Sequence, residues 1–187
     1  YDTTQIVIPK TVVICTDKFD EFMEQNNLYD IAYSENLSDE EILNHFLEAK
    51  IPEDVWADLR AFVNVIDTPI AVRSSSLLED AHYQPFAGVY STYMVPNNKD
   101  DVKSTLMKLG EAIKAVYASV YYSGSRSYMT ATKNVISREK MAVVLQEVCG
   151  KAYGDRFYPS FSGVARSLNY YPIGDEKPED GVVNVAL

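Results

Sequence analysis

The chain has 187 residues, of which 47% are hydrophobic, enough for one domain with a sizeable core. Its formal charge of −10 argues against a general nucleic-acid binder, because such proteins carry a basic patch or stripe. No apolar run approaches the length of a membrane span, and no segment has the features of a signal peptide. Cys15 and Cys149 lie in apolar runs, so we expect reduced core thiols and a cytoplasmic location.

The first part of the chain is predicted to be mainly helical. A strand is expected at 11–15, followed by a helix that Thr16 caps. A second helix begins at Ser38, whose hydroxyl can form a capping box with Glu41. A third helix has Pro52 at its first position. Periodicity places these residues on the buried faces of the three helices: Phe19, Phe22, Met23, Ile42, Phe46, Leu47, Val55, Trp56, Leu59, Phe62 and Val63.

Strands are predicted to dominate the later part of the chain. One long helix is expected at about 100–121, with Asp100 and Asp101 at its positive N-terminal end. The segment 123–134 is predicted to be a loop or a ragged helix, and 96–98 a turn. Apolar runs and alternation predict strands at 68–76, 89–95, 140–148, 162–172 and 181–187.

This order of elements indicates an α+β fold with at least one mixed sheet and packed helices. Two subdomains are possible, a mainly helical one at 1–66 and a sheet with the long helix at 67–187. The chain opens on Tyr1 and closes on an alternating apolar run without turn residues, so we expect a piece of a longer protein.

Several common site signatures are missing from the sequence. It contains no Gly-x-x-x-x-Gly-Lys-Ser/Thr loop and no Gly-x-Gly-x-x-Gly segment, the commonest phosphate-binding motifs. The only histidines are His45 and His82, and with two distant cysteines they do not predict a zinc site. No Gly-x-Ser-x-Gly nucleophile elbow is present. The remaining candidate is the polar stretch 70–93.

This stretch places an arginine and three serines at the end of an apolar run. The guanidinium of Arg73 is shaped to bind two phosphate oxygens at once, and Ser74 starts a row of hydroxyl donors. Gly88 lets the backbone approach a ligand closely, and Thr92 supplies another hydroxyl. Together these residues can surround a polyphosphate.

A simpler interpretation of the same stretch remains open. Arg73 can pair with Glu79 or Asp80 in an ordinary surface loop, and Gly88 can merely turn the chain. Under that interpretation the protein is a purely structural α+β domain, and Arg73→Ala changes stability rather than nucleotide affinity.

The stretch AVRSSSLLEDAHYQPFAGVYSTY resembles a family signature, Val-Arg-Ser-Ser-x-x-x-Glu-Asp followed by Phe-Ala-Gly-x-x-x-Thr-Tyr. This signature belongs to the ATP-grasp nucleotide-binding domain of the phosphoenolpyruvate synthase and pyruvate phosphate dikinase family. Weaker similarity in IVIPKTVVICTDKFDEFMEQNNL, AIKAVYASVYY, KMAVVLQEV and FSGVARSLNYYPIG extends the resemblance over nearly the whole chain, in order.

The resemblance implies roles for single residues. Arg73 and Thr92 would contact the ATP phosphates, and Gly88 would lie in the loop that closes over them. Gln146 would contact the adenosine, while the backbone of Glu147 and Val148 would face the adenine edge between apolar side chains.

The resemblance also implies cofactors and partners. ATP would bind with Mg²⁺, whose ligands would come from outside this chain, as would the family's phosphate-binding lysine and catalytic arginine. The partners would be the remaining lobe of the ATP-grasp domain, a phosphohistidine domain, and pyruvate or another acceptor. The chain would therefore not catalyse phosphoryl transfer alone. The alternative is a catalytically inactive nucleotide-binding or regulatory module that retains the fold.

Overall fold

The computed structural model describes residues 6–76, 79, 90–131 and 139–186. The chain divides into two compact units, Tyr1–Val148 and Cys149–Leu187. Within the described ranges, no helix combines the length and hydrophobicity that a membrane span needs.

Amphipathic helices make up most of the first unit. The predicted capping box begins α3: the Ser38 hydroxyl accepts the Glu41 N–H at 3.3 Å, and the Glu41 carboxylate accepts the Ser38 N–H at 2.8 Å. At α5 the carboxylate of Asp101 accepts the N–H of Ser104. The helices are α1 (Thr16–Gln25), α2 (Tyr29–Ala32), α3 (Asp39–Glu48), α4 (Glu53–Val65), α5 (Val102–Ser119) and α6 (Ser123–Ala131), with a 3₁₀ turn, η1, at Lys99–Asp101.

One four-stranded sheet organises this unit. It consists of β1 (Thr11–Ile14), β2 (Ile70–Ser75), β3 (Tyr93–Val95) and β4 (Ala142–Glu147), in the order β1-β4-β2-β3. The predicted α+β fold class is confirmed. The expected mixed sheet is not found in the described part of the chain, since every strand pair there is antiparallel.

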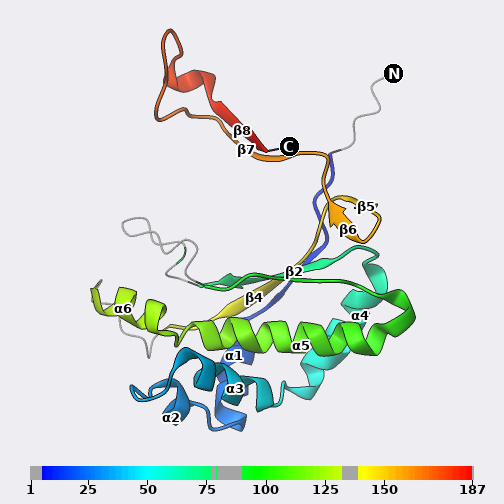
Figure 1. Ribbon diagram of the computed structural model, residues 1–187, viewed down its shortest axis with the longest axis vertical. Coiled ribbons are helices and arrows are strands. Elements are labelled where there is room, and N and C mark those ends of the chain that lie inside the picture. The colour runs from blue at the N-terminus through cyan, green and yellow to red at the C-terminus, as the bar shows by residue number, and fades with distance from the viewer. Residues whose placement is uncertain (1–5, 77–78, 80–89, 132–138, 187) are drawn as a thin grey trace. The chain divides into compact units, whose positions relative to one another are not determined.

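The core of the first unit lies between the helices and one face of this sheet. Figure 1 shows α1, α3 and α5 on the same side of the sheet. From that face Ile70, Val72, Val143 and Leu145 project, and each is 0% exposed. Burial of such apolar surface is the main stabilising term, at roughly 25 cal/mol per Å².

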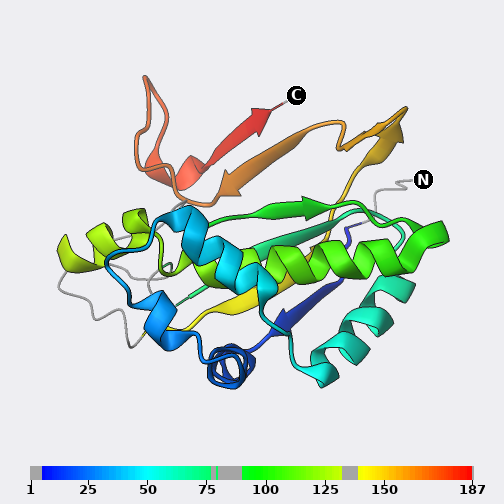
Figure 2. The same cartoon turned by 60° about the horizontal axis from the view of Figure 1, so that its bottom comes forward.

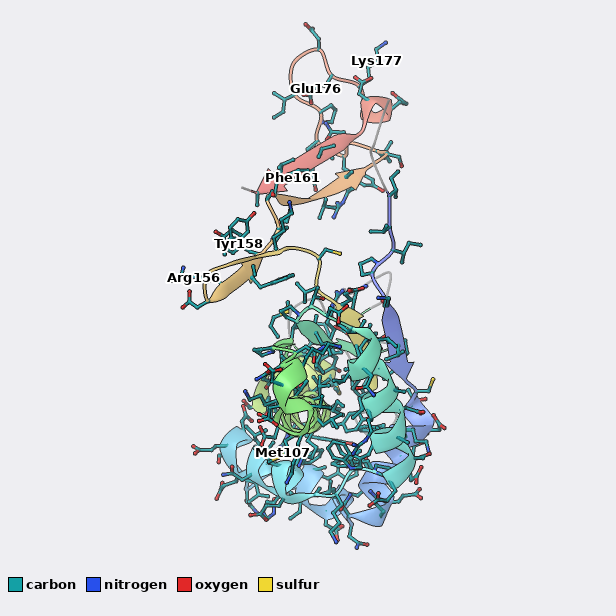
Figure 3. All side chains as sticks on the ribbon, turned by 90° about the vertical axis from the view of Figure 1, so that its right-hand side faces the viewer. Met107, Arg156, Tyr158, Phe161, Glu176 and Lys177 are labelled. Atoms are coloured by element: carbon teal, nitrogen blue, oxygen red, sulfur yellow. The ribbon has the colours of Figure 1, made fainter. Side chains whose placement is uncertain are left out.

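The second unit consists of two hairpins. β5 (Lys151–Tyr153) pairs with β6 (Arg156–Tyr158), and β7 (Ser162–Arg166) pairs with β8 (Val182–Ala186). A 3₁₀ turn, η3, lies at Pro178–Asp180. The rings of Tyr153 and Tyr158 stack at 4.4 Å between centroids, and Figure 3 labels Tyr158 and Arg156 on β6. A cross-strand aromatic pair of this kind stabilises a short hairpin.

Several local predictions are corrected. Cys15, rather than Thr16, is the N-cap of α1, and no side chain caps that helix. Pro52 is the N-cap of α4 instead of its first helical residue. Trp56 is half-buried, and Cys15 and Cys149 are exposed free thiols rather than core residues. A one-residue shift at a helix end explains the first two differences.

Element boundaries also differ from the predictions. The ambiguous segment at 123–134 forms α6 over Ser123–Ala131. Of the strand expected at 89–95, the described residues 90–95 form a strand only in β3, Tyr93–Val95. The β5–β6 hairpin was not predicted, because Gly154 and Asp155 separate runs of only three residues.

Candidate functional site

The sheet has a second face, which points away from the core packed between the sheet and the helices and on which Ala71 is buried. Successive side chains of a strand alternate between faces, and directly paired residues share one. The register therefore assigns two rows of residues to this second face, here called the open face. The first row crosses all four strands and consists of Thr11, Gln146, Ala71 and Met94. The second row crosses three strands and consists of Val13, Val144 and Arg73.

Arg73 is exposed on the open face, near the end of β2. Val72 pairs with Tyr93, so the same register continued by one residue places Thr92 opposite Arg73. Thr92 is also exposed. No ion pair joins Arg73 to a carboxylate among residues 6–76, 79, 90–131 and 139–186.

Gln146 lies on the same face, two residues along β4 from Val144, which is the direct partner of Arg73. Such diagonal neighbours lie about 7–8 Å apart. The amide Nε2 of Gln146 donates to the hydroxyl of Thr11 at 3.2 Å. The structure thus brings Arg73, Thr92 and Gln146 onto one surface, where a single extended ligand can contact all three.

Ser74 is not part of this surface. It follows Arg73 and therefore points to the opposite face. Its hydroxyl donates to Oε1 of Glu79 at 2.8 Å, and Oε2 of the same carboxylate accepts the N–H of Ser76 at 3.1 Å. Glu79 thus fixes the end of β2, and no ion pair joins it to Arg73. Asp80, the other partner that the simpler interpretation allows, lies outside the described residues.

The backbone N–H groups of Glu147 and Val148 are already bonded. Glu147 donates to the carbonyl of Lys10 and Val148 to that of Pro69, both at 2.9 Å. Any contact of these two residues with a ligand therefore falls to their carbonyl oxygens or side chains. Gly88 lies outside the described residues.

A buried polar contact lies beside the end of β2. The hydroxyl of Tyr90 donates to Oε1 of Glu139 at 3.3 Å, and the side chains of Ser76, Tyr90 and Glu139 are each less than one-tenth exposed. Burial raises the pKa of Tyr90, and the nearby Glu139 carboxylate raises it further. Tyr90 therefore acts as a neutral hydrogen-bond donor at physiological pH.

An apolar cavity of about 750 Å³ lies between β1 and α4 and shares Val13 with the open face. Its lining includes Val12, Ile14, Leu59 and Phe62, and none of the predicted site residues. Its one lining cation, Lys18, is bonded to Glu21 and Asp54. The described residues also contain no cluster of histidine, cysteine or carboxylate side chains able to hold a metal ion.

Sequence reasoning missed the neighbours of the predicted residues on the open face. Thr11, Val13 and Met94 were interpreted only as strand residues, yet the register places them beside Gln146 and Arg73. Val13 is 52% exposed and Met94 64% exposed, so apolar surface accompanies the polar groups. No signal in the sequence reveals this arrangement, because β1 and β4 are more than 100 residues apart.

The sequence matches the model of a known protein family. The model of the pyruvate phosphate dikinase AMP/ATP-binding domain matches residues 1–187. No curated protein matches the chain.

Proposed function

Because the chain belongs to the family of pyruvate phosphate dikinase AMP/ATP-binding domains, we propose that its nucleotide binds on the open face of the four-stranded sheet. One observation carries this proposal: Arg73 is exposed there beside Thr92 and diagonal to Gln146. Arg73 and Thr92 would contact the ATP phosphates, and Gln146 the adenosine.

The chemistry of this face suits a nucleotide. A guanidinium forms bidentate bonds with phosphate oxygens, and the hydroxyl of Thr92, the residue before β3, adds a donor. Val13, Val144 and Met94 supply apolar surface for a base. Ser74 points to the other face and would support the strand end through Glu79 rather than bind phosphate.

In the complete enzyme we propose phosphoryl transfer from ATP, through a phosphohistidine domain, to pyruvate or another acceptor. Mg²⁺ would neutralise the phosphate charge and would be held by residues outside this chain, as would the catalytic arginine. The chain would bind and orient the nucleotide, and the remaining lobe of the ATP-grasp domain would complete the site. Binding without transfer in the full-length protein would favour the inactive module instead.

Calorimetric binding of magnesium ATP to the full-length protein tests this proposal. Arg73→Ala is expected to weaken ATP binding about tenfold or more, because it removes a charge-assisted contact to phosphate. Arg60→Ala on α4 is the control and should leave the affinity unchanged, since Arg60 lies on no open-face strand. Equal affinity of the wild type and a folded Arg73→Ala variant, or no binding by either, would overturn the proposal.

A further inference from the structure

The side-chain amide of Gln146 is held by a short chain of hydrogen bonds. Its Nε2 donates to Oγ1 of Thr11 at 3.2 Å, and Oγ1 of Thr11 donates to the carbonyl oxygen of Pro9 at 3.0 Å. Thr11 and Gln146 are direct partners in the β1–β4 register, and Figure 2 shows the blue β1 along the yellow β4. The Gln146 amide, the Thr11 hydroxyl and the Pro9 carbonyl thus connect the open face to the segment before β1.

The direction of these bonds follows from the groups themselves. A carbonyl oxygen can only accept, so the single hydroxyl proton of Thr11 is used at Pro9. Thr11 can then only accept at its contact with Gln146, and the amide atom facing it must be nitrogen. Rotating the amide by 180° would place two acceptors against each other. The amide oxygen of Gln146 therefore faces away from Thr11.

We propose that Thr11 is a positioning residue that makes Gln146 present a hydrogen-bond acceptor to the nucleobase. This inference rests on the proposed function, and it concerns which base the open face accepts. Adenine carries an exocyclic amino group at position 6, which donates to an amide oxygen. Hypoxanthine carries a carbonyl oxygen at that position, which an acceptor repels. The Thr11–Gln146 pair thus selects a base with an amino group at position 6.

The test compares the binding of ATP and inosine triphosphate to the full-length protein. The wild type is expected to bind ATP more tightly. Thr11→Val keeps the shape and strand preference of the side chain but removes the hydroxyl, and should lower the ATP:inosine triphosphate affinity ratio roughly threefold to tenfold. Thr11→Ser keeps the hydroxyl and should restore the ratio. Arg73→Ala should weaken both nucleotides equally and leave the ratio unchanged.

A second variant makes the test independent of any change in strand β1. In Gln146→Glu both terminal side-chain atoms are oxygens, so the side chain presents an acceptor whatever Thr11 does. Adding Thr11→Val to this variant should not alter the ratio.

An unchanged affinity ratio in a folded Thr11→Val variant would overturn the inference. If both affinities also fell equally, the result would indicate that Thr11 only supports the strand. Failure of the proposed function is distinct, because the wild type would then bind neither nucleotide, or Arg73→Ala would weaken neither.

Discussion

Thr92 is placed opposite Arg73 when the β2–β3 register is continued by one residue past its last pair, Val72 with Tyr93. If both side chains hold the same phosphate group, their contributions to ATP affinity must depend on each other. We expect Thr92→Val to weaken binding less than Arg73→Ala, because a neutral hydroxyl forms a weaker bond to phosphate than a guanidinium does.

A double-mutant cycle measured by calorimetry checks this coupling. The two changes together should cost less than the sum of the single effects, with a coupling energy of about 0.5–3 kcal/mol. The pair Thr92→Val and Arg60→Ala provides the control and should be additive. Strict additivity of Arg73 and Thr92 would contradict a shared phosphate.

Two helical glycines are expected to respond oppositely to alanine. A Cβ at Gly110 in α5 would lie 2.5 Å from Cη2 of Trp56, whereas a Cβ at Gly124 in α6 meets no described atom within 4 Å. Gly110→Ala should therefore lower the free energy of unfolding by about 1–3 kcal/mol. Gly124→Ala should raise it by up to about 1 kcal/mol, through lower backbone entropy of the unfolded chain. Urea unfolding measures both, and stabilisation by Gly110→Ala would show that Trp56 moves aside at little cost.

Alkaline pH is expected to destabilise the first unit through buried tyrosines. Tyr121 is 1% exposed, and its burial raises its pKa, with Tyr33 and Tyr29 adding to the effect. In the unfolded chain a tyrosine has its usual pKa of about 10. Below about pH 10 the tyrosine is protonated in both states, and the free energy of unfolding is not affected. Above about pH 10 the unfolded chain loses this proton first, so the free energy of unfolding falls as the pH rises.

Tyr121→Phe should reduce the slope of stability against pH above pH 10, by up to about 1.4 kcal/mol per pH unit. Tyr117→Phe should act similarly, because burial raises the pKa of Tyr117 as well. Chemical unfolding at a series of pH values measures the slope. An unchanged slope in both variants would mean that these hydroxyls do not resist ionisation in the folded protein.

The capping box of α3 gives a fourth prediction. Ser38→Ala should destabilise the protein by about 1 kcal/mol at neutral pH, whereas Ser38→Gly should cost only a few tenths of that amount. The backbone N–H of Ser38 lowers the pKa of Glu41, and so does the Ser38 hydroxyl, which donates to Oε2 of Glu41 at 2.8 Å. Ser38→Ala removes only the hydroxyl contact, which is present above the unfolded pKa of Glu41 and is lost as the pH falls through the folded value. The effect of Ser38→Ala, measured by thermal unfolding, should therefore shrink in acid. A constant effect would indicate that Glu41 does not take part.

Local signals in the sequence predicted most of the secondary structure. The capping box at Ser38, the long helix that forms α5 and the continuous apolar runs of β2 and β4 depend on neighbouring residues, and each was confirmed. The α1 start was wrong by one residue, because Cys15 and Thr16 both precede an acidic first turn and spacing cannot choose between them.

The candidate site depended on long-range pairing that the sequence does not encode locally. Arg73, Thr92 and Gln146 were chosen by motif resemblance, and their roles stay predictions. Their common face follows only from the β4–β2–β3 register. A shift of one residue in that register would send Gln146 or Arg73 to the covered face. The same dependence explains why Thr11 was missed.

The pairing of β1 with β4 has a consequence for how the chain folds. The contact between Thr11 and Gln146 spans 135 residues, and β1 pairs with no other strand in the described part of the chain. Helices α1 to α5 can form while the ribosome is still making the chain, but β1 has to wait until β4 has emerged. Closing so long a loop costs entropy before any contact compensates for it, which makes this step slow. During synthesis the apolar β1 and β2 are therefore exposed to association with other chains until the last strand of the sheet arrives.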